Sequence, residues 1–291
     1  MMRIAVASGK GGTGKTTVAV ALAETLALDN DQTVLISDCD VEAPNVHLYL
    51  DPVIEQSKDV PILIPQINKE ICTGCGICVD VCQFNAIILL KDRPIVFPAL
   101  CHGCGSCTLN CSENAIREIP NQIGTLERGV GNGDIYLRHG LLNPGELLTV
   151  PVIANLRKWK EGLSPKIEII DSPPGASCPV VESIRGADFL ILVTEPTPFG
   201  LHDLKQAQQV ANELEMRTGV IINREGIGET DIKGYCREMN IPVLMTIPLD
   251  KKIGAGLARG KTLLEIYPEY GNRFKVLLSE IRQVVGEVVG S

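Results

Sequence analysis

Eight of the eleven cysteines in this chain belong to two copies of one spacing pattern, C-x2-C-x2-C-x3-C. The first copy consists of Cys72, Cys75, Cys78 and Cys82, and the second consists of Cys101, Cys104, Cys107 and Cys111. The tripeptide Asn-Ala-Ile follows both copies at the same offset, at 85–87 and at 114–116. Glycines inside the runs, such as Gly74 and Gly103, favour tight turns that bring thiolates together. The two runs therefore predict two metal centres within one short segment.

The rest of the sequence indicates which metal chemistry to expect. The N-terminal residues lead directly into an apolar strand, which leaves no room for a signal peptide, and no apolar stretch reaches the roughly 18 residues of a membrane span. We therefore expect a cytoplasmic protein, in which clustered cysteines bind metal rather than form disulfides. Zinc is the alternative, but zinc sites use two CxxC units separated by a longer loop. The runs instead resemble those of bacterial ferredoxins that hold two [4Fe–4S] clusters.

The ferredoxin resemblance implies an exchange of ligands, because the fourth cysteine of each run binds the other cluster in those proteins. It assigns one cluster to Cys72, Cys75, Cys78 and Cys111, and the second to Cys101, Cys104, Cys107 and Cys82. One departure concerns the residue after the fourth cysteine, which is usually proline and is here Gln83 or Ser112. This departure affects the local turn and leaves all eight sulfur ligands in place.

A second motif, at 9–16, has the pattern G-x-x-x-x-G-K-[ST] of a phosphate-binding loop. An apolar run precedes it, and apolar residues at helical spacing follow it. In such loops backbone N–H groups point at phosphate oxygens, and the N-terminus of the next helix adds partial positive charge. Lys15 is expected to reach the β- and γ-phosphates, and Thr16 is expected to bind Mg²⁺. The residues predicted to bind the phosphates of ATP are Gly11, Gly12, Thr13, Gly14, Lys15, Thr16 and Thr17.

The loop also carries Lys10 directly after its first glycine. The stretch from Lys10 to Thr17 resembles the deviant Walker A motif of the MinD/ParA/Mrp ATPases of the SIMIBI class, to which nitrogenase iron protein is related. In that family this lysine crosses the interface of a sandwich dimer and contacts the partner subunit's nucleotide, as an arginine finger does. The resemblance implies a homodimer in which Lys10 is catalytic, and a solvent-facing lysine is the alternative.

Two later strands end in acids that resemble the switch motifs of the same family. One ends at Asp38 and is followed by Asp40 and a Pro-Asn turn, and the other ends at Asp171 and leads through two prolines to Gly175. The resemblance implies that Asp40 orients the attacking water and that Asp38 lies close to the metal. It also implies that Asp171 acts on Mg²⁺ through a water and that Gly175 senses the γ-phosphate.

Further apolar runs predict the remainder of a parallel sheet. They lie at 189–193, 220–222 and 243–247. By the same resemblance Asn223 hydrogen-bonds adenine, and Pro248 and Asp250 lie beside the base, with turn capping as the alternative role for Asn223 and Asp250. The predicted fold class is α/β: a mostly parallel, doubly wound P-loop NTPase sheet with an inserted small α+β ferredoxin-like module.

The cysteine runs interrupt the ATPase-like pattern of the chain. We expect a discontinuous ATPase domain made of 1–65 and 120–291, and an inserted module at 66–119 that is bounded by Pro61, Pro65 and Pro120. An insertion whose ends are neighbours leaves the core of the host domain intact. Two segments after the module, 124–129 and 135–138, are predicted to pair as strands around an Asn-Gly turn.

Three cysteines lie outside the runs. Cys39 and Cys236 are expected to be small buried side chains. Cys178 follows the second switch, where nitrogenase iron protein carries a cluster ligand, so that a similar role is an open alternative.

Charge and helical pattern limit the classes of partner. The net charge is −8 and no run of basic residues is present, so we expect no nucleic-acid binding. The C-terminal segment has apolar residues at helical spacing with acids balancing its bases, which favours packing on the core over membrane binding.

These patterns together predict a dimeric ATPase that binds Mg-ATP, carries two [4Fe–4S] clusters and hydrolyses ATP slowly without a partner. ATP binding and hydrolysis would be coupled to electron transfer with a partner protein, as the kinship to nitrogenase iron protein suggests. One alternative is a carrier of iron–sulfur clusters or metal, although no extra CxxC of the kind that such carriers use to bridge monomers lies near the C-terminus. Another is a spatial organiser like MinD or ParA with redox-sensing clusters.

Overall fold

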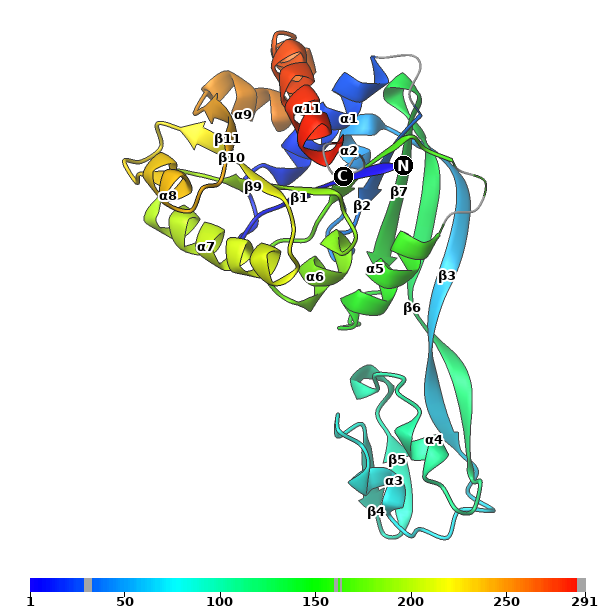
Figure 1. Cartoon of the computed structure of the whole chain (residues 1–291). Coiled ribbons are helices and arrows are strands. Elements are labelled where there is room, and N and C mark those ends of the chain that lie inside the picture. Colours follow the sequence, from blue (N-terminus) through cyan, green and yellow to red (C-terminus); the bar gives the residue numbers. More distant parts are fainter. Residues whose placement is uncertain (29–32, 160–161, 163, 287–291) are drawn as a thin grey trace.

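A nine-stranded sheet forms the centre of the larger part of the protein (Figure 1). The computed structural model describes residues 1–28, 33–159, 162 and 164–286. The strands of the sheet are β1 (Met2–Ala7), β2 (Val34–Asp38), β3 (Val53–Ile67), β6 (Ile116–Gly131), β7 (Ile135–Leu142), β8 (Ile167–Asp171), β9 (Phe189–Thr194), β10 (Thr218–Glu225) and β11 (Val243–Pro248). Their order is β11-β10-β9-β1-β8-β2-β7-β6-β3, with parallel pairing from β11 to β7 and antiparallel pairing of β6 with β7 and β3.

Helices cover both faces of this sheet, and each face has its own apolar core. One face packs against α1 (Lys15–Ala27), α2 (His47–Leu50), α9 (Lys251–Leu257), α10 (Leu263–Ile266) and α11 (Tyr270–Gly286). The other packs against α5 (Thr149–Lys158), α6 (Cys178–Ile184), α7 (Pro198–Glu213) and α8 (Ile232–Glu238). This cover explains the nearly continuous apolar strands, because parallel strands buried on both faces have little use for polar side chains. The predicted α/β class and the core-packing C-terminal helix are confirmed.

Two strands extend far beyond the sheet as a ribbon. β3 and β6 pair from Val53 opposite Val130 down to Ile67 opposite Ile116, whereas β6 pairs with β7 only between Gly124 and Gly131. The pairing predicted for 124–129 and 135–138 is confirmed, with a short 3₁₀ turn (Asn132–Asp134) between the strands. The strand predicted at 124–129 is shorter than the observed strand β6, which begins at Ile116 and ends at Gly131.

The three prolines expected at the module boundary lie within the ribbon instead of ending its strands. A two-stranded ribbon tolerates proline because half of its backbone N–H groups face away from the pairing strand. The boundaries predicted after residues 65 and 119 thus fall inside β3 and β6, and the division into domains stays a prediction.

The cysteine runs lie at the far end of the ribbon (Figure 1). This part of the chain contains α3 (Ile77–Asp80), the hairpin of β4 (Ile87–Leu90) and β5 (Arg93–Val96), a 3₁₀ turn (Pro98–Leu100) and α4 (Ser106–Leu109). Its own small apolar core includes Ile87, Cys107 and Ile116. We call residues 66–119 the cysteine module. None of the helices in the described part of the chain is both long and apolar enough to cross a membrane.

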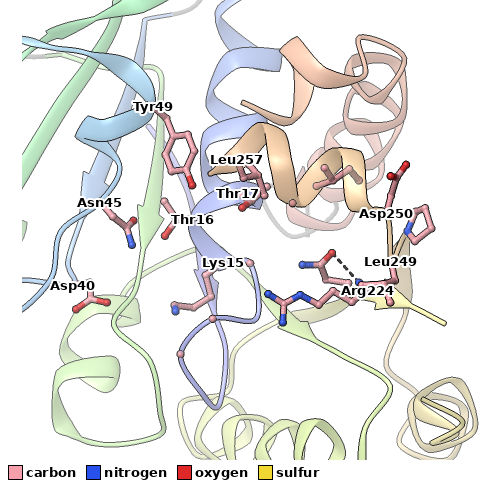
Figure 2. A pocket seen from close by; sticks show the side chains of 17 residues that line it. Lys15, Thr16, Thr17, Asp40, Asn45, Tyr49, Arg224, Leu249, Asp250 and Leu257 are labelled. Atoms are coloured by element: carbon pink, nitrogen blue, oxygen red, sulfur yellow. Dashed lines mark hydrogen bonds between the residues drawn. The ribbon is translucent and has the colours of Figure 1, made fainter. Parts of the chain in front are cut away.

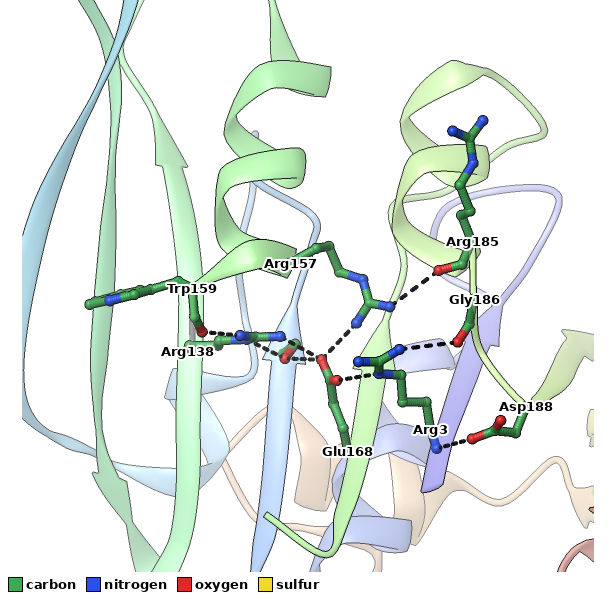
Figure 3. Close-up of polar contacts among 9 residues, drawn as sticks. Arg3, Arg138, Arg157, Trp159, Glu168, Arg185, Gly186 and Asp188 are labelled. Carbon is green, nitrogen blue, oxygen red and sulfur yellow. Dashed lines mark hydrogen bonds and ion pairs between the residues drawn. The ribbon is translucent and has the colours of Figure 1, made fainter. Parts of the chain in front are cut away.

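A buried carboxylate joins four elements on the face of the sheet that α5 and α6 cover (Figure 3). Glu168 on β8 accepts hydrogen bonds of 2.7 Å from Arg138 on β7 and from Arg157 on α5, and one of 2.8 Å from Ser37 on β2. Burial opposes ionisation of Glu168, but the charges of the two arginines outweigh it and hold its pKa below the ordinary value. A second oxygen of Glu168 lies 3.4 Å from Arg3 on β1.

Replacing Glu168 by glutamine is expected to lower the free energy of unfolding of the sheet part by about 3–5 kcal/mol, because Arg138 and Arg157 would remain buried without their counter-ion. Chemical denaturation followed by circular dichroism measures the change. Glu213→Gln, on the exposed end of α7, is the matched control and should change stability by less than about 0.5 kcal/mol. Equal stability of Glu168→Gln and the parent protein would contradict the structural role of this carboxylate.

Candidate functional site

The loop between β1 and α1 has the backbone conformation of a phosphate cradle. Gly12 and Gly14 have φ angles of 77° and 99°, in the left-handed region that favours glycine. A side chain at Gly14 would also place its Cβ 2.3 Å from Nδ2 of Asn223, which donates a 2.7 Å hydrogen bond to the carbonyl of Thr13. Asn223 therefore holds the loop from the end of β10, a structural role that the sequence did not predict.

Lys15, Thr16 and Asp171 meet where the loop enters α1. Lys15 is buried, and the hydroxyl of Thr16 donates a 2.6 Å hydrogen bond to Oδ2 of Asp171 at the end of β8. The other oxygen, Oδ1, is buried and has no hydrogen-bond partner among the described residues. Burial, together with the negative charge of Asp38, raises the pKa of Asp171 to about 8. A hydroxyl beside a buried, unpaired carboxylate oxygen is a donor set that fits Mg²⁺.

Asp38 and Asp40 play different parts at the end of β2. Asp38 is fully buried and accepts backbone hydrogen bonds from Asp40 (3.0 Å), Asn45 (2.8 Å) and Val46 (3.1 Å), so it fixes the turn that follows β2. Burial nevertheless raises its pKa to about 6. Asp40 is less buried and lines the pocket described next, and the charge of Lys15 opposes the rise in its pKa that burial causes.

A pocket of about 310 Å³ lies beside the loop (Figure 2). The predicted residues in its lining are Gly11, Gly12, Gly14, Lys15, Thr16, Thr17, Asp40, Asn223, Pro248 and Asp250. Thr13 and Gly175 lie outside the lining, as do Lys10, Asp38 and Asp171. Its size falls in the range of small-molecule sites, roughly 300–1,000 Å³. The elements that meet here are the carboxyl ends of parallel strands, where α/β sheets bind ligands.

The pocket has further walls that the sequence did not indicate. They are formed by Asn45, Tyr49, Arg224, Leu249, Ile253, Gly254 and Leu257. Figure 2 shows Asn45 and Tyr49 on the side of the first switch and Leu249 and Asp250 on the opposite side, with Lys15 between them. Spacing after Asp250 could have revealed Ile253 and Leu257, since both lie on one face of α9.

Asp250 has the capping role that was left open. It accepts a hydrogen bond of 2.7 Å from the backbone of Lys252 at the start of α9 and one of 2.6 Å from the hydroxyl of Tyr267. Capping does not exclude contact with a base, because Asp250 also lines the pocket.

Lys10 contacts its own chain. Its ammonium group pairs with Glu195, a buried residue that follows β9. The other oxygen of Glu195 lies 3.2 Å from Arg224, one of the residues that line the pocket. Gly175, at the second switch, donates its N–H to the carbonyl of Ser8 (3.0 Å) and has a φ of 104°. The loop is thus tied to both β9 and the second switch.

The eight clustered cysteines surround two small cavities in the cysteine module. Cys72, Cys75, Cys78 and Cys111 line one cavity, and Cys82, Cys101, Cys104 and Cys107 line the other. These groups coincide with the two ligand sets that the ferredoxin resemblance implied. In each cavity three sulfur atoms come from one run and the fourth comes from the other run. Four thiols around an apolar cavity are a donor set that can hold a [4Fe–4S] cluster.

Single-ion sites look different. Among the residues that the structure describes, no group of three or more His, Cys, Asp or Glu side chains is arranged to hold one metal ion. The ligand set of a [4Fe–4S] cluster encloses a group of atoms rather than a single ion.

The repeated Asn-Ala-Ile tripeptide turns the chain after each run and places a backbone N–H at the fourth cysteine. Asn85 and Asn114 adopt left-handed φ angles of 52° and 50°, which turn the chain after each fourth cysteine. The next residue, Ala86 or Ala115, then donates its N–H to the sulfur of Cys82 or Cys111 at 3.3 Å. Both turns form without the usual proline. Hydrogen bonds from backbone N–H groups to sulfur are a general means of tuning cluster potentials.

The three remaining cysteines lie in two kinds of environment. Cys39 and Cys236 are completely buried, which confirms the prediction of small buried side chains. Cys178 is exposed at the first residue of α6, and a ligand role for it stays an open alternative.

Comparison with protein families agrees with the geometry of the pocket. Residues 4–263 match the family described as the CobQ/CobB/MinD/ParA nucleotide binding domain. An uncharacterized protein of Methanocaldococcus jannaschii is 30% identical over 291 residues, which cover 98% of each chain. An iron-sulfur cluster carrier protein of Methanococcus maripaludis is 23% identical, with 96% of this chain and 83% of that protein covered.

Among solved structures, the septum site-determining protein MinD from Pyrococcus horikoshii, in complex with Mg-ADP, superimposes with a TM-score of 0.59. The two sequences are 21% identical, and the match covers 98% of this chain and 97% of the other. At this identity the likeness establishes the fold.

Proposed function

Because the chain belongs to the CobQ/CobB/MinD/ParA nucleotide-binding family, we propose that it is a Mg-ATP-dependent ATPase whose nucleotide state controls electron transfer through two [4Fe–4S] clusters. The observation that carries this proposal is the pair of four-cysteine cavities on a ribbon that starts just after the first switch. A partner protein would exchange electrons with the clusters. Nucleotide control requires that the two states of the switch differ in contacts to the ribbon or to the partner.

Each residue of the pocket has a chemical task in this proposal. The backbone of the loop and Lys15 bind the β- and γ-phosphates, and Thr16 and Asp171 hold Mg²⁺, which neutralises charge on the phosphoryl oxygens when it is bound. Asp40 lies in the pocket near the charge of Lys15, where it can accept a hydrogen bond from the attacking water. Asp38 holds the turn that carries Asp40, and Asn223 holds the loop.

The active form in this proposal is a homodimer. In the single chain the ammonium group of Lys10 pairs with Glu195, and Lys10 is not among the residues that line the pocket. On dimerisation Lys10 would leave Glu195 and approach the partner subunit's nucleotide. A positive charge supplied in this way stabilises the transferring phosphoryl group.

Affinity for Mg-ATP is expected to depend on pH through Asp171. Its pKa of about 8 means that the carboxyl group is protonated at neutral pH and becomes charged as the pH rises. A proton on the carboxylate competes with the metal, so affinity should fall by up to about tenfold per pH unit below that pKa. Isothermal titration with Mg-ATP between pH 8.5 and 7 measures the slope.

Two controls separate this effect from titration elsewhere in the protein. Binding of ATP in the presence of EDTA should vary much less over the same interval, and Asp171→Asn should bind Mg-ATP weakly with no slope. A flat affinity for Mg-ATP in the parent protein would remove Asp171 from the metal site.

The coupling itself is tested by anaerobic electron transfer. The protein, reduced with dithionite and freed of excess reductant, is mixed with an electron acceptor isolated from the native cytoplasm by affinity capture. Reoxidation of the clusters is followed by their visible absorbance with Mg-ATP, Mg-ADP or no nucleotide. The proposal expects rates that differ between the nucleotide states, and three equal rates would show that the coupling is absent.

A second candidate function is the delivery of clusters to other proteins. The relative from Methanococcus maripaludis is named an iron-sulfur cluster carrier protein, and Cys75 and Cys104 are exposed at the two cavities. Incubation with an apo-ferredoxin distinguishes the two candidates. Carrier clusters pass to the acceptor within minutes, whereas clusters that serve electron transfer stay with the protein.

A further inference from the structure

The ribbon leaves the sheet at a β-bulge. Val60 of β3 pairs with Gly124 of β6, but the next residue, Pro61, pairs with Gln122. Ile123 is therefore the extra residue of the bulge. Its side chain is completely buried in the apolar core on the face of the sheet that α5, α6, α7 and α8 cover. A bulge bends and twists the strand that contains it, so this position sets the angle of the ribbon.

Asn143 holds both carbonyl groups at this bulge. Its backbone N–H donates a 2.9 Å hydrogen bond to the carbonyl of Ile123, and its side-chain Nδ2 donates a 3.0 Å hydrogen bond to the carbonyl of Gln122. Both contacts cross from the end of β7 to the point where β6 loses β7 as its partner. Asn143 thus bonds β6 at the point where the ribbon leaves β7.

The same end of β7 is bonded to the first switch. Leu142, the neighbour of Asn143, donates its N–H to the carbonyl of Val41 at 2.9 Å, and Val41 follows Asp40 directly. Gly140 leaves room for Val41, because a Cβ there would lie 2.7 Å from Cγ1 of Val41. A movement of the Asp40 turn therefore reaches Asn143 through one hydrogen bond and one peptide unit.

A second set of contacts ties the ribbon base to the same switch. Asp171, Asp38, His139 and Glu127 occupy one row across β8, β2, β7 and β6. His139 contacts Glu127 at 3.0 Å and packs edge-on against His47 of α2, with ring centroids 5.6 Å apart. Asn143 and His139 of β7 thus both contact β6, and each is linked to the first switch, Asn143 through Leu142 and Val41 and His139 through its strand partner Asp38.

We propose that Asn143 is a positioning residue through which the first switch sets the angle of the ribbon, and with it the place of the cysteine module. This inference rests on the proposed nucleotide control and supplies its mechanical link. From the bulge to Ile116 the ribbon extends for about 25 Å at the rise of a β-strand. A tilt of about 10° at its base would displace the module by about 4 Å.

The test measures the position of the module against the sheet in the dimeric holoprotein. Two dyes are attached through noncanonical side chains at Leu109 in the module and at Glu213 on α7, both of which are exposed. Energy transfer between them is compared with Mg-ADP and with a non-hydrolysable Mg-ATP analogue. The parent protein is expected to give two different distances.

The variant Asn143→Asp keeps the size of the side chain and the backbone N–H but has no donor for the carbonyl of Gln122. It should keep its iron content, and its nucleotide affinity should stay within about twofold of the parent value, while the distance no longer differs between nucleotides. Asn143→Gln retains an amide donor and should retain the difference in distance. Asn155→Asp, whose amide bonds only within α5, is the matched control and should behave like the parent protein.

Two results would overturn the inference, and they differ in what else they affect. If Asn143→Asp keeps the parent's difference in distance, or if Asn143→Gln loses it as completely as Asn143→Asp, Asn143 does not position the ribbon and the proposed function stands. If the parent protein binds both nucleotides and shows one distance, nucleotide control of the module fails as well.

Discussion

Replacing Lys10 by alanine is expected to lower kcat for ATP hydrolysis by about 10³-fold or more, the range known for a positive charge supplied to the phosphoryl group in trans. Binding of Mg-ATP should change little, because Lys10 pairs with Glu195 in its own chain. Steady-state hydrolysis and isothermal titration measure the two quantities separately. Lys69→Ala, an exposed lysine of the cysteine module, is the control and should leave both unchanged.

Mixed dimers decide whether Lys10 acts on its own nucleotide or on that of the partner. Lys10→Ala and Asp40→Ala should each be inactive alone. In a mixed dimer the Lys10→Ala subunit keeps Asp40 and receives Lys10 from the other subunit, so one complete site forms. An equimolar mixture should therefore regain about a quarter of the parent activity, since half of the dimers are mixed and each has one working site. A mixture as inactive as its components would place Lys10 in its own site.

In the single chain, the ion pair with Glu195 should keep Lys10 from reaching the partner subunit's nucleotide. Glu195 is buried, and both of its oxygens are engaged, one by Lys10 and the other by Arg224. Replacing a buried carboxylate that carries two ion pairs releases both cations, so in Glu195→Gln we expect Lys10 to be freed for the partner. Lys10 follows β1 and Glu195 follows β9; these strands are neighbours in the sheet, although 185 residues separate Lys10 from Glu195 in the sequence.

That distance in the sequence explains which parts of the site could be predicted. The loop from Gly11 to Thr17 is local, because strand, glycines and helix follow one another and their geometry depends on neighbouring residues. Asp38 and Asp171 were also predicted, since each ends a strand of recognisable apolar pattern. Tyr49, Glu195 and Arg224 were missed because their places depend on strand order, which hydrophobic periodicity does not encode.

The ribbon shows a second limit. Pro61, Pro65 and Pro120 indicate breaks in regular structure when they are considered singly, yet all three lie in paired strands. Whether a proline ends a strand depends on whether its missing N–H would have faced a partner. That information comes only from the pairing, so the length of the ribbon and the bulge at Ile123 could not be inferred from the sequence.

The exchange of cysteines between the two runs leads to the second large effect that we expect. Cys82→Ser should remove the cluster at the cavity lined by Cys101, Cys104 and Cys107, although Cys82 belongs to the other run. Cys111→Ser should remove the cluster at the other cavity. Each variant should lose about half of the bound iron, because each cluster needs its full set of four thiolates. Iron and sulfide analysis of protein reconstituted under anaerobic conditions measures the loss.

Double variants then separate exchanged ligands from ligands that stay within one run. Cys75 and Cys104 are suitable probes, because they occupy the same position in the two runs and both are exposed, so their replacement costs little packing. If Cys82 and Cys104 serve one cluster, the double variant should retain about as much iron as either single variant. Cys82→Ser combined with Cys75→Ser affects both clusters and should lose nearly all of the iron. The reverse result, with the iron lost from the Cys82 and Cys104 pair and half retained by the Cys82 and Cys75 pair, would assign each run to its own cluster and contradict the arrangement of the two cavities.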